Sequence, residues 1–231
     1  MQAKDSLYPL LEPLLPFVET PGQYVGNEVN AAEKDISAVE AAFALAYPDT
    51  YAVGMSHLGL RILYDVINRH PEAAAERVFA PWPDMHRAMR EHGIPLFSLE
   101  SHSPVSRFDV FGFSLQYEMN AANVLQMLDL AGIPLRSSER GTGHPIVLGG
   151  GPLVCNPEPF APFFDCFFVG EAEEGIVDII EGIREAKRSR LSRGDTLRKL
   201  ACEVPGVYVP AFYEPVYDKG KFAGMKVAEG V

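Results

Sequence analysis

A chain of 231 residues with 47% hydrophobic and 22% charged side chains can bury one substantial core, and this balance excludes an intrinsically disordered protein. Its net charge of −11 would repel a phosphodiester backbone, so direct nucleic-acid binding is not expected. The three cysteines, Cys155, Cys166 and Cys202, have no CxxC or CxxxCxxC spacing, which argues against a disulfide framework and against a cysteine-built zinc or iron–sulfur site.

The sequence gives no sign of a membrane or secreted protein. The N-terminus lacks the apolar segment of a signal peptide, and no uninterrupted apolar stretch could span a bilayer, so a cytoplasmic protein is expected. One local exception to the acidic character is a basic stretch at residues 184–193. A charge run at the end of a helix is usually a solvated face, and that interpretation is favoured here.

The chain is expected to begin with an arm, residues 1–38, that lies outside any sheet. Leucines recur at helical spacing between residues 7 and 15, but Pro9 and Pro13 interrupt them, which predicts a short, broken amphipathic segment. The turn-rich stretch 21–28 then connects the arm to the rest of the chain.

Residues 39–190 are predicted to form an α/β domain in which strands and helices alternate. Apolar runs closed by Gly or Pro mark the strands, and apolar positions at helical spacing mark the helices. In chain order these are a strand at 42–47, a helix from about 60 to 67, a strand at 77–80, a helix at 83–92, an edge strand at 95–98, a strand at 109–114, a helix at 120–131, strands at 145–148 and 166–169, and a helix at 171–187. Right-handed crossovers between such strands give a doubly wound, mostly parallel, Rossmann-like sheet with helices on both faces.

The tail, residues 191–231, has a different pattern. A short helix is predicted at 196–201, followed by a hairpin whose strands, 213–217 and 222–227, turn at 219–221. This tail is interpreted as a linker and hairpin that lead to a further domain beyond Val231.

The candidate site lies where the strands end. In open parallel sheets, ligands bind outside the carboxyl ends of the strands, at the switch in strand order. Glycines at these ends let a ligand approach the backbone, and hydroxyl or amide side chains give it directional hydrogen bonds. The candidate cofactor-binding residues are Gly54, Ser56, His57, Gly59, Ser114, Gln116, Tyr117, Gly149, Gly150, Gly151, Gly170 and Glu171.

Each candidate also has a purely structural interpretation. The glycines can simply make tight turns between strand and helix, and Ser56 and Ser114 can cap helices. His57 can cap the helix that follows it instead of ligating a metal or acting as a base. Acidic side chains around Glu171 are stabilised in the first turn of a helix without any ligand. The clustering at several strand ends favours a site, but no catalytic residue and no metal ligand is assigned.

The same acidic turn limits the chemistry of a ligand. A phosphate about 4 Å from a surface carboxylate would be disfavoured by roughly 4 kcal/mol. The phosphate-binding patterns GxGxxG and GxxxxGK[ST] are both absent. An uncharged ligand with an amide or hydroxyl rim therefore fits the strand ends best.

Four segments resemble one known family. They read YVGNE (24–28), YPDTYAVGMSHLG (47–59), FSLQYE (113–118) and GGP followed by NPEP (150–159). Together they are similar to the large radical SAM proteins that carry an N-terminal cobalamin-binding-type domain. The resemblance covers nearly the whole chain, most firmly residues 20–185.

The resemblance implies a cobalamin-binding-type fold ahead of a radical SAM barrel. The barrel would hold the [4Fe–4S] cluster and S-adenosylmethionine, and it would be this domain's partner, located downstream of Val231. Carried over, Gly54, Ser56, Ser114, Gly150, Gly151, Gly170 and Glu171 would face the cobalamin. The cobalt-binding motif DxHxxG is absent, because Met55 stands two residues before His57, so cobalamin would bind without that histidine. Ala172 also stands where many relatives have glycine.

Three functions remain open from the sequence. The first is a domain that positions a corrinoid or shapes the active-site entrance of a radical SAM enzyme. The second is a degenerate module that binds no ligand and supports the barrel through its arm and tail. The third is an independent small-molecule enzyme of the flavodoxin-like class.

Overall fold

The computed structural model describes residues 6–231, so the first five residues of the predicted arm lie outside it. The strands are β1 (Ala41–Tyr47), β2 (Ala73–Phe79), β3 (Val110–Ser114), β4 (Ile146–Gly150), β5 (Cys166–Phe168), β6 (Val207–Tyr208), β7 (Tyr213–Asp218) and β8 (Lys221–Val227). The α-helices are α1 (Tyr8–Leu11), α2 (Tyr51–Gly54), α3 (Leu58–Arg69), α4 (Pro83–His92), α5 (Asn120–Leu130), α6 (Ala172–Arg188) and α7 (Arg193–Glu203). The 3₁₀ turns are η1 (Glu12–Phe17), η2 (Pro21–Tyr24), η3 (Val105–Arg107), η4 (Ser137–Glu139), η5 (Pro152–Cys155), η6 (Glu158–Phe163) and η7 (Pro210–Phe212).

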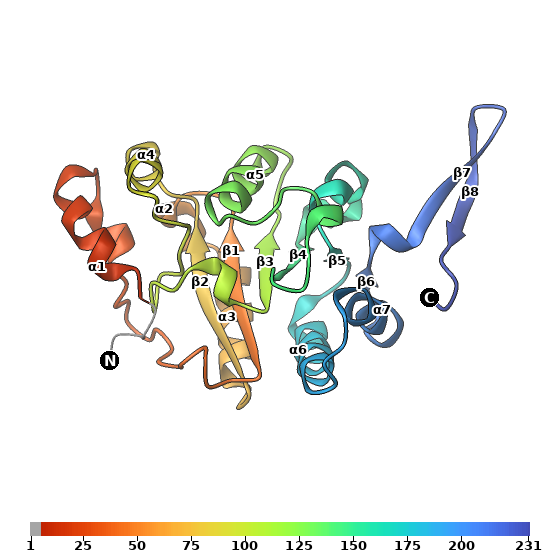
Figure 1. Ribbon diagram of the computed structural model, residues 1–231, viewed down its shortest axis with the longest axis horizontal. Helices are drawn as coiled ribbons and strands as arrows, with labels where there is room; N and C mark the ends of the chain where they lie inside the picture. The colour runs from red at the N-terminus through yellow and green to blue at the C-terminus, as the bar shows by residue number, and fades with distance from the viewer. Residues whose placement is uncertain (1–5) are drawn as a thin grey trace.

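The central sheet confirms the predicted α/β class. Its strand order is β2-β1-β3-β4-β5-β6, and every neighbouring pair is parallel except β5 with β6, which is antiparallel. The chain steps outward from β1 to β2 and then returns past β1 to β3, as Figure 1 shows. The switch in strand order therefore lies between β1 and β3, the place where doubly wound sheets bind their ligands.

Alternate residues of the strands supply two separate cores, one on each face of the sheet. In β1, Ala42, Ala44 and Ala46 face the core formed with α4 and α5, while Phe43 and Leu45 face the core formed with α3 and α6. Because both faces are buried, β1 is apolar along its whole length instead of alternating with polar residues.

The N-terminal arm packs along the β2 side of the sheet in short helical pieces. Leu11 and Leu14 join the core beneath α4, and the backbone N–H of Trp82 donates a hydrogen bond to the Tyr24 hydroxyl at 3.0 Å. The prolines explain why the arm is helical only in pieces, since each removes a backbone donor.

Three local predictions were wrong. Residues 95–98 form no strand: Phe97 makes an isolated bridge to Pro104, and the N–H of Leu96 is used by Leu130 at the end of α5. β2 begins at Ala73, four residues earlier than predicted, because its alanines pair with β1 although alanine has little strand preference of its own. α7 begins at Arg193 and not at residue 196, since the Ser192 hydroxyl accepts from the N–H of Asp195 and caps the helix there.

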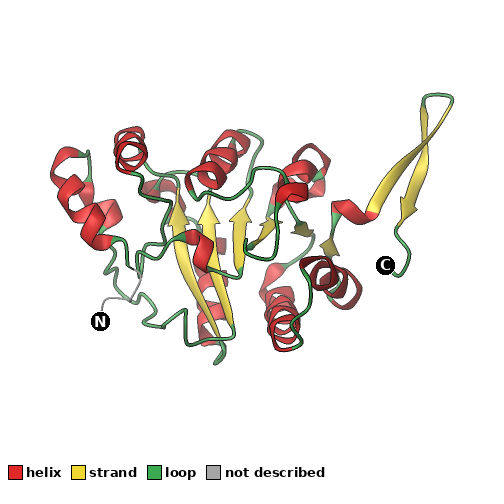
Figure 2. Cartoon of the chain, viewed as in Figure 1, coloured by secondary structure: helices red, strands yellow, loops and turns green. Residues whose placement is uncertain are grey.

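The C-terminal hairpin, β7 and β8, is confirmed. Its turn at Lys219 and Gly220 has positive φ at both residues, as a two-residue hairpin turn of right-handed twist requires. Figure 2 shows the hairpin projecting away from the central sheet. Across the described part of the chain, every helix is too short or too polar to cross a membrane.

Candidate functional site

The predicted cofactor residues all lie at the carboxyl ends of the strands or in the segments that directly follow them. Gly54, Ser56, His57 and Gly59 follow β1. Ser114 ends β3, and Gln116 and Tyr117 follow it. Gly149 and Gly150 end β4 with Gly151 directly after them, and Gly170 and Glu171 follow β5. The loops after β1 and β3 flank the switch point directly.

Those two loops are hydrogen-bonded to each other by the chain's own side chains. The Tyr117 hydroxyl donates to Asp49 Oδ2 at 3.1 Å, and the amide of Asn123 donates to the Pro48 carbonyl at 2.9 Å. The Asn120 amide reaches the same carbonyl at 3.3 Å, and its Oδ1 accepts from the N–H of Gln116 at 3.1 Å. The hydrogen bond to Asp49 raises the pKa of Tyr117, so this phenol stays a donor at physiological pH. The crevice at the switch point is therefore bridged from side to side.

Sequence reasoning missed the residues that make this bridge. Asp49 was considered only as part of the segment 47–59 that carries the family resemblance, and Asn120 and Asn123 were treated only as part of a helix. Their contacts join segments about 70 positions apart, as the separations of 68 and 75 for the Asp49 and Asn123 bonds show. The sequence signal that could have indicated this bridge is the pair of asparagines, Asn120 and Asn123, at the start of the helix after β3.

Three of the site's glycines are accounted for by packing inside the protein. A Cβ at Gly54 would lie 2.4 Å from the Phe79 ring, and one at Gly149 would lie 2.6 Å from the Phe167 ring. At Gly151, with φ of +100°, a Cβ would lie 2.6 Å from the Leu115 carbonyl oxygen. Gly150 differs, because a Cβ there would meet no atom within 4 Å. These glycines thus mainly allow other parts of the protein to pack close to the backbone.

The histidine and serines of the site have local partners. His57 caps α3, since its Nδ1 accepts from the N–H of Leu60 at 3.1 Å, and its ring packs against Tyr47. Ser56 instead donates to the Ala52 carbonyl at 3.0 Å, and Ser114 accepts from the Gln116 amide at 2.8 Å. Neither serine caps a helix, so that alternative was wrong, whereas the capping interpretation of His57 is confirmed.

A small apolar hollow lies beside the loops that follow β3 and β4. It measures about 290 Å³ and is walled by Val124 and Leu125 of α5 and by Leu153, Phe160 and Phe163 of the η5–η6 segment. Pockets for drug-sized ligands measure roughly 300–1,000 Å³, and a corrinoid is larger than a drug-sized ligand. A corrinoid inserted between β1 and β3 would have to break the hydrogen bonds from Tyr117 to Asp49 and from Asn123 to Pro48. Within residues 6–231, no three His, Cys, Asp or Glu side chains gather closely enough to hold a metal ion.

The same carboxyl edge exposes large apolar side chains. Each of the loops after β1, β2, β3 and β5 contributes at least one. The exposed residues are Val53, Leu58, Trp82, Tyr117, Met119 and Val169. Met119 is the most exposed of them, at 80%. Exposed apolar residues gathered on one side of a protein mark interaction surfaces more often than scattered ones do.

Comparisons with known proteins agree with this architecture. Residues 59–210 match the family model described as "Radical SAM proteins, N-terminal". An uncharacterized protein of Methanocaldococcus jannaschii is 24% identical over 187 residues, which cover 76% of this chain and 36% of the relative. The chain thus spans about a third of the length of that relative, and no solved structure matches. Since the family model covers well over half of the chain, this protein belongs to the family of N-terminal domains of radical SAM proteins.

Proposed function

We propose that this domain supports the radical SAM domain of a longer polypeptide and docks against it through the carboxyl edge of the sheet. The observation that carries the proposal is that this edge is bridged by the chain's own hydrogen bonds and yet exposes Leu58, Tyr117 and Met119. A surface whose loops are bonded to each other and expose apolar side chains suits a protein partner better than a cofactor.

The family supplies the identity of that partner. Family members are N-terminal portions of radical SAM proteins, and the relative from Methanocaldococcus jannaschii is much longer than this chain. The iron–sulfur cluster and S-adenosylmethionine would belong to the second domain. The proposal expects a CxxxCxxC triplet in the coding sequence downstream of Val231, which can be read directly.

Hydrogen–deuterium exchange tests the docking surface. In the full-length polypeptide, amides in residues 48–59 and 115–120 should exchange more slowly than in the 231-residue chain alone, because the second domain would cover them. Equal exchange in both proteins would refute docking through this edge.

A pair of charge insertions sharpens the test. Met119→Glu places a charge on the edge and should restore fast exchange there in the full-length polypeptide. Val29→Glu is the matched control, since Val29 is 91% exposed but lies in the arm, and it should change nothing at the edge.

Corrinoid binding is tested separately by mixing the chain with hydroxocobalamin, passing it through gel filtration and recording the visible spectrum. A colourless protein peak is expected, because a corrinoid would have to break the bonds from Tyr117 to Asp49 and from Asn123 to Pro48. A coloured peak would support the alternative function, in which the domain positions a corrinoid.

A further inference from the structure

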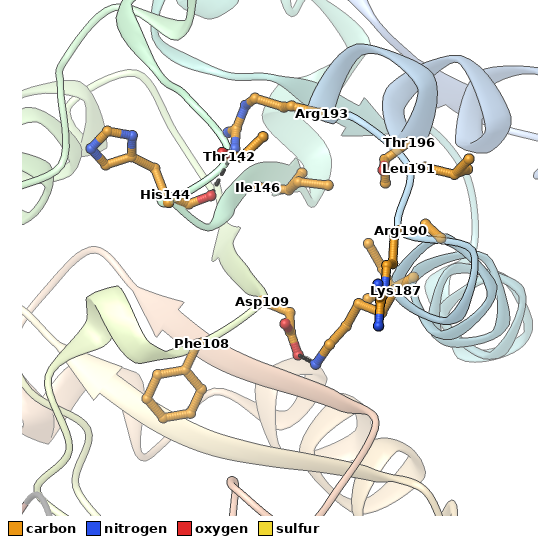
Figure 3. A pocket seen from close by; sticks show the side chains of 13 residues that line it. Phe108, Asp109, Thr142, His144, Ile146, Lys187, Arg190, Leu191, Arg193 and Thr196 are labelled. Carbon is orange, nitrogen blue, oxygen red and sulfur yellow. Dashed lines mark hydrogen bonds and ion pairs between the residues drawn. The ribbon is translucent and has the colours of Figure 1, made fainter.

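The amino edge of the sheet, opposite the candidate site, holds a pocket of about 200 Å³ that the sequence analysis did not anticipate. Its walls come from the segment before β3, the 141–144 loop before β4, the end of α6 and the start of α7. Figure 3 shows Thr142 and His144 on one side and Lys187 and Arg190 on the other. The pocket is independent of the docking surface proposed above.

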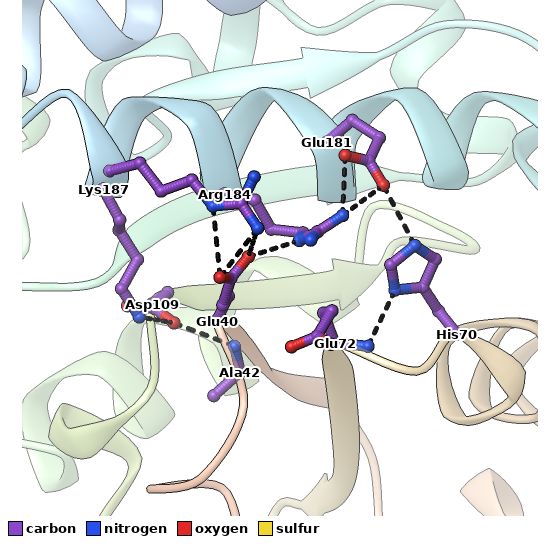
Figure 4. A network of polar contacts seen from close by, with 9 residues as sticks. Glu40, Ala42, His70, Glu72, Asp109, Glu181, Arg184 and Lys187 are labelled. Atoms are coloured by element: carbon purple, nitrogen blue, oxygen red, sulfur yellow. Dashed lines mark hydrogen bonds and ion pairs between the residues drawn. The ribbon is translucent and has the colours of Figure 1, made fainter.

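The basic residues of 184–193 that line the pocket are those that do not pair with Glu40 outside it. Arg184 and Arg188 both bind Glu40 on the outside of the sheet, as Figure 4 shows for Arg184. Lys187 binds Asp109 Oδ2 at 2.8 Å, and that oxygen also accepts from the N–H of Ala42. Arg190 is exposed, lines the pocket and has no ion-pair partner among residues 6–231.

A buried ion cluster behind the pocket, formed by Arg140, Arg193 and Asp165, has a net charge of +1. The guanidinium groups of Arg140 and Arg193 both bind Asp165 Oδ2, at 3.0 and 2.7 Å. The three side chains are only 0%, 12% and 2% exposed for Arg140, Arg193 and Asp165. The Nε of Arg193 is buried and has no acceptor in the described chain. Backbone carbonyls, including those of Phe163 and Pro145, accept further hydrogen bonds from the two guanidinium groups, but the cluster keeps a net charge of +1 in a region of low dielectric.

Together these groups produce a local excess of two positive charges in a strongly acidic protein. Four cations, Lys187, Arg190, Arg193 and Arg140, face two carboxylates, Asp109 and Asp165. Glu139 also acts on Arg140, but its side chain is exposed to solvent, which screens it. An anion of charge −2 would complete the neutralisation.

The other residues that line the pocket indicate the chemistry of the rest of the ligand, beyond its anionic group. Phe108, Ile146, Ile183 and Leu191 give the pocket an apolar wall, and the Thr142 hydroxyl makes no hydrogen bond within residues 6–231. Arginine binds phosphate oxygens through two parallel N–H donors, and such charge-assisted bonds are the strong ones.

We infer that this pocket binds a small molecule with a dianionic oxyanion, a phosphate monoester, on an apolar body. Arg190 and Lys187 hold the oxyanion, the buried charge of the Arg140–Asp165–Arg193 cluster adds attraction, and the apolar wall holds the body. The interpretation of residues 184–193 as a solvated face then holds for Arg188, which is 57% exposed, but not for Arg184, which is only 11% exposed, nor for Arg190, which lines the pocket.

Isothermal titration of the 231-residue chain with phenyl phosphate at low ionic strength tests the inference. Saturable one-to-one binding is expected, and benzoate, which has the same ring but one charge, should bind more weakly. Arg190→Ala should weaken the binding of phenyl phosphate about tenfold or more, because it removes a charge-assisted contact. Arg188→Ala is the matched control: it removes the same charge two residues away, at the end of α6 and outside the pocket, and should change the affinity by no more than about twofold.

Amide shifts in the ¹⁵N NMR spectrum locate the ligand. They should concentrate in residues 141–144 and 187–193 during the titration. Absence of saturable binding, shifts spread elsewhere, or equal weakening by Arg190→Ala and Arg188→Ala would each overturn the pocket. Equal affinity for benzoate and phenyl phosphate would overturn its preference for a dianion.

Discussion

Arg77 and Glu100 form a buried ion pair at the edge of the sheet formed by β2. Arg77 Nε lies 2.6 Å from Glu100 Oε1, and both side chains are less than 10% exposed, at 7% and 6%. Arg77 also reaches Glu28 of the arm at 3.3 Å and lies over the Tyr64 ring. Burial raises the pKa of Glu100 to about 7, although the charge of Arg77 opposes this shift. Arg77 therefore joins the arm to the sheet through Glu28, and its second carboxyl partner, Glu100, titrates near neutrality.

Glu100 should make the stability of the protein depend on pH. A carboxyl whose pKa is higher in the folded state binds its proton more tightly there, so its contribution is fully present below pH 4.5 and is lost as the pH rises to about 7. Relative to Glu100→Gln, the free energy of unfolding of the native protein should fall by ~3 kcal/mol across that range.

Urea denaturation of both proteins at a series of pH values measures this difference. Glu76 and His102 lie nearby, and burial raises the pKa of the first and lowers that of the second. Both titrate in the variant as well, so the comparison removes their own contributions and leaves that of Glu100 together with its repulsion from Glu76. Parallel pH curves for the two proteins would contradict the role of Glu100.

Asp165 is predicted to be the most sensitive charged residue of the fold. Besides the two arginines, its Oδ2 accepts from the N–H of Val147 at 2.7 Å, so it also fixes the start of β4. Asp165→Asn would leave two buried guanidinium groups without an anion and should cost ~3–5 kcal/mol in chemical denaturation. Asp65→Asn, which breaks an exposed pair with Arg69 on α3, should cost less than ~0.5 kcal/mol. Similar losses in the two variants would show that the buried cluster has no special weight.

At the scale of elements, the sequence predicted the strands best where apolar residues follow one another, and less well at β2, which is equally buried but contains Glu76 and Arg77. Residues 42–47 and 166–169 are continuous apolar runs, and 109–114 is apolar between Asp109 and Ser114. The structure places β1, β3 and β5 within a residue of these predicted ranges. β6 has only two residues and was not predicted, because so short a strand has no period to detect.

The candidate site shows the limit of this reasoning more clearly. The density of glycine correctly marked the carboxyl edge, because glycine is readable in a sequence. The structural role of these glycines could not be inferred from the sequence. The atoms beside Gly54 and Gly149 belong to Phe79 and Phe167, which lie on other elements. Whether these positions also meet a cofactor stays a prediction, for which the hydroxocobalamin experiment is the test.

Gly175 is predicted to set the distance between α6 and the sheet. A Cβ at Gly175 would lie 2.1 Å from the Phe168 ring of β5, so α6 can pack this closely only without a side chain there. Gly175→Ala should therefore destabilise the protein by ~1–3 kcal/mol, although alanine favours a helix.

Gly194 in α7 is the matched control for that change. The nearest atom to a Cβ at Gly194 is the Ser192 hydroxyl oxygen at 3.9 Å, so the site is open. Gly194→Ala should stabilise the protein by up to ~1 kcal/mol through helix propensity alone. If thermal denaturation showed both substitutions to be stabilising, α6 would have room to move away from Phe168.

At the scale of the whole molecule, two pieces are attached to the sheet with different strength. The arm contributes Leu11, which is 0% exposed, to the core beneath α4, and bonds its backbone to the loop at His102. The hairpin of β7 and β8 is exposed along nearly its whole length and meets the rest mainly through Arg198 and the Tyr208–Tyr213 ring contact. The arm is thus part of the folded domain, whereas the hairpin is an appendage.

This difference predicts that removing the hairpin should hardly change the stability of the protein, whereas shortening Leu11 in the arm should lower it strongly. Ending the chain after Phe212 removes the hairpin but no core residue, so the melting temperature should stay within ~3 °C of the native value. A two-stranded hairpin alone is marginally stable in water, so it has little stability to contribute to the sheet. Leu11→Ala should instead cost ~2–5 kcal/mol, because it leaves a cavity in the core on the α4 face. If the shortened chain melted far below the native protein while Leu11→Ala did not, the hairpin and not the arm would be the piece that completes the domain.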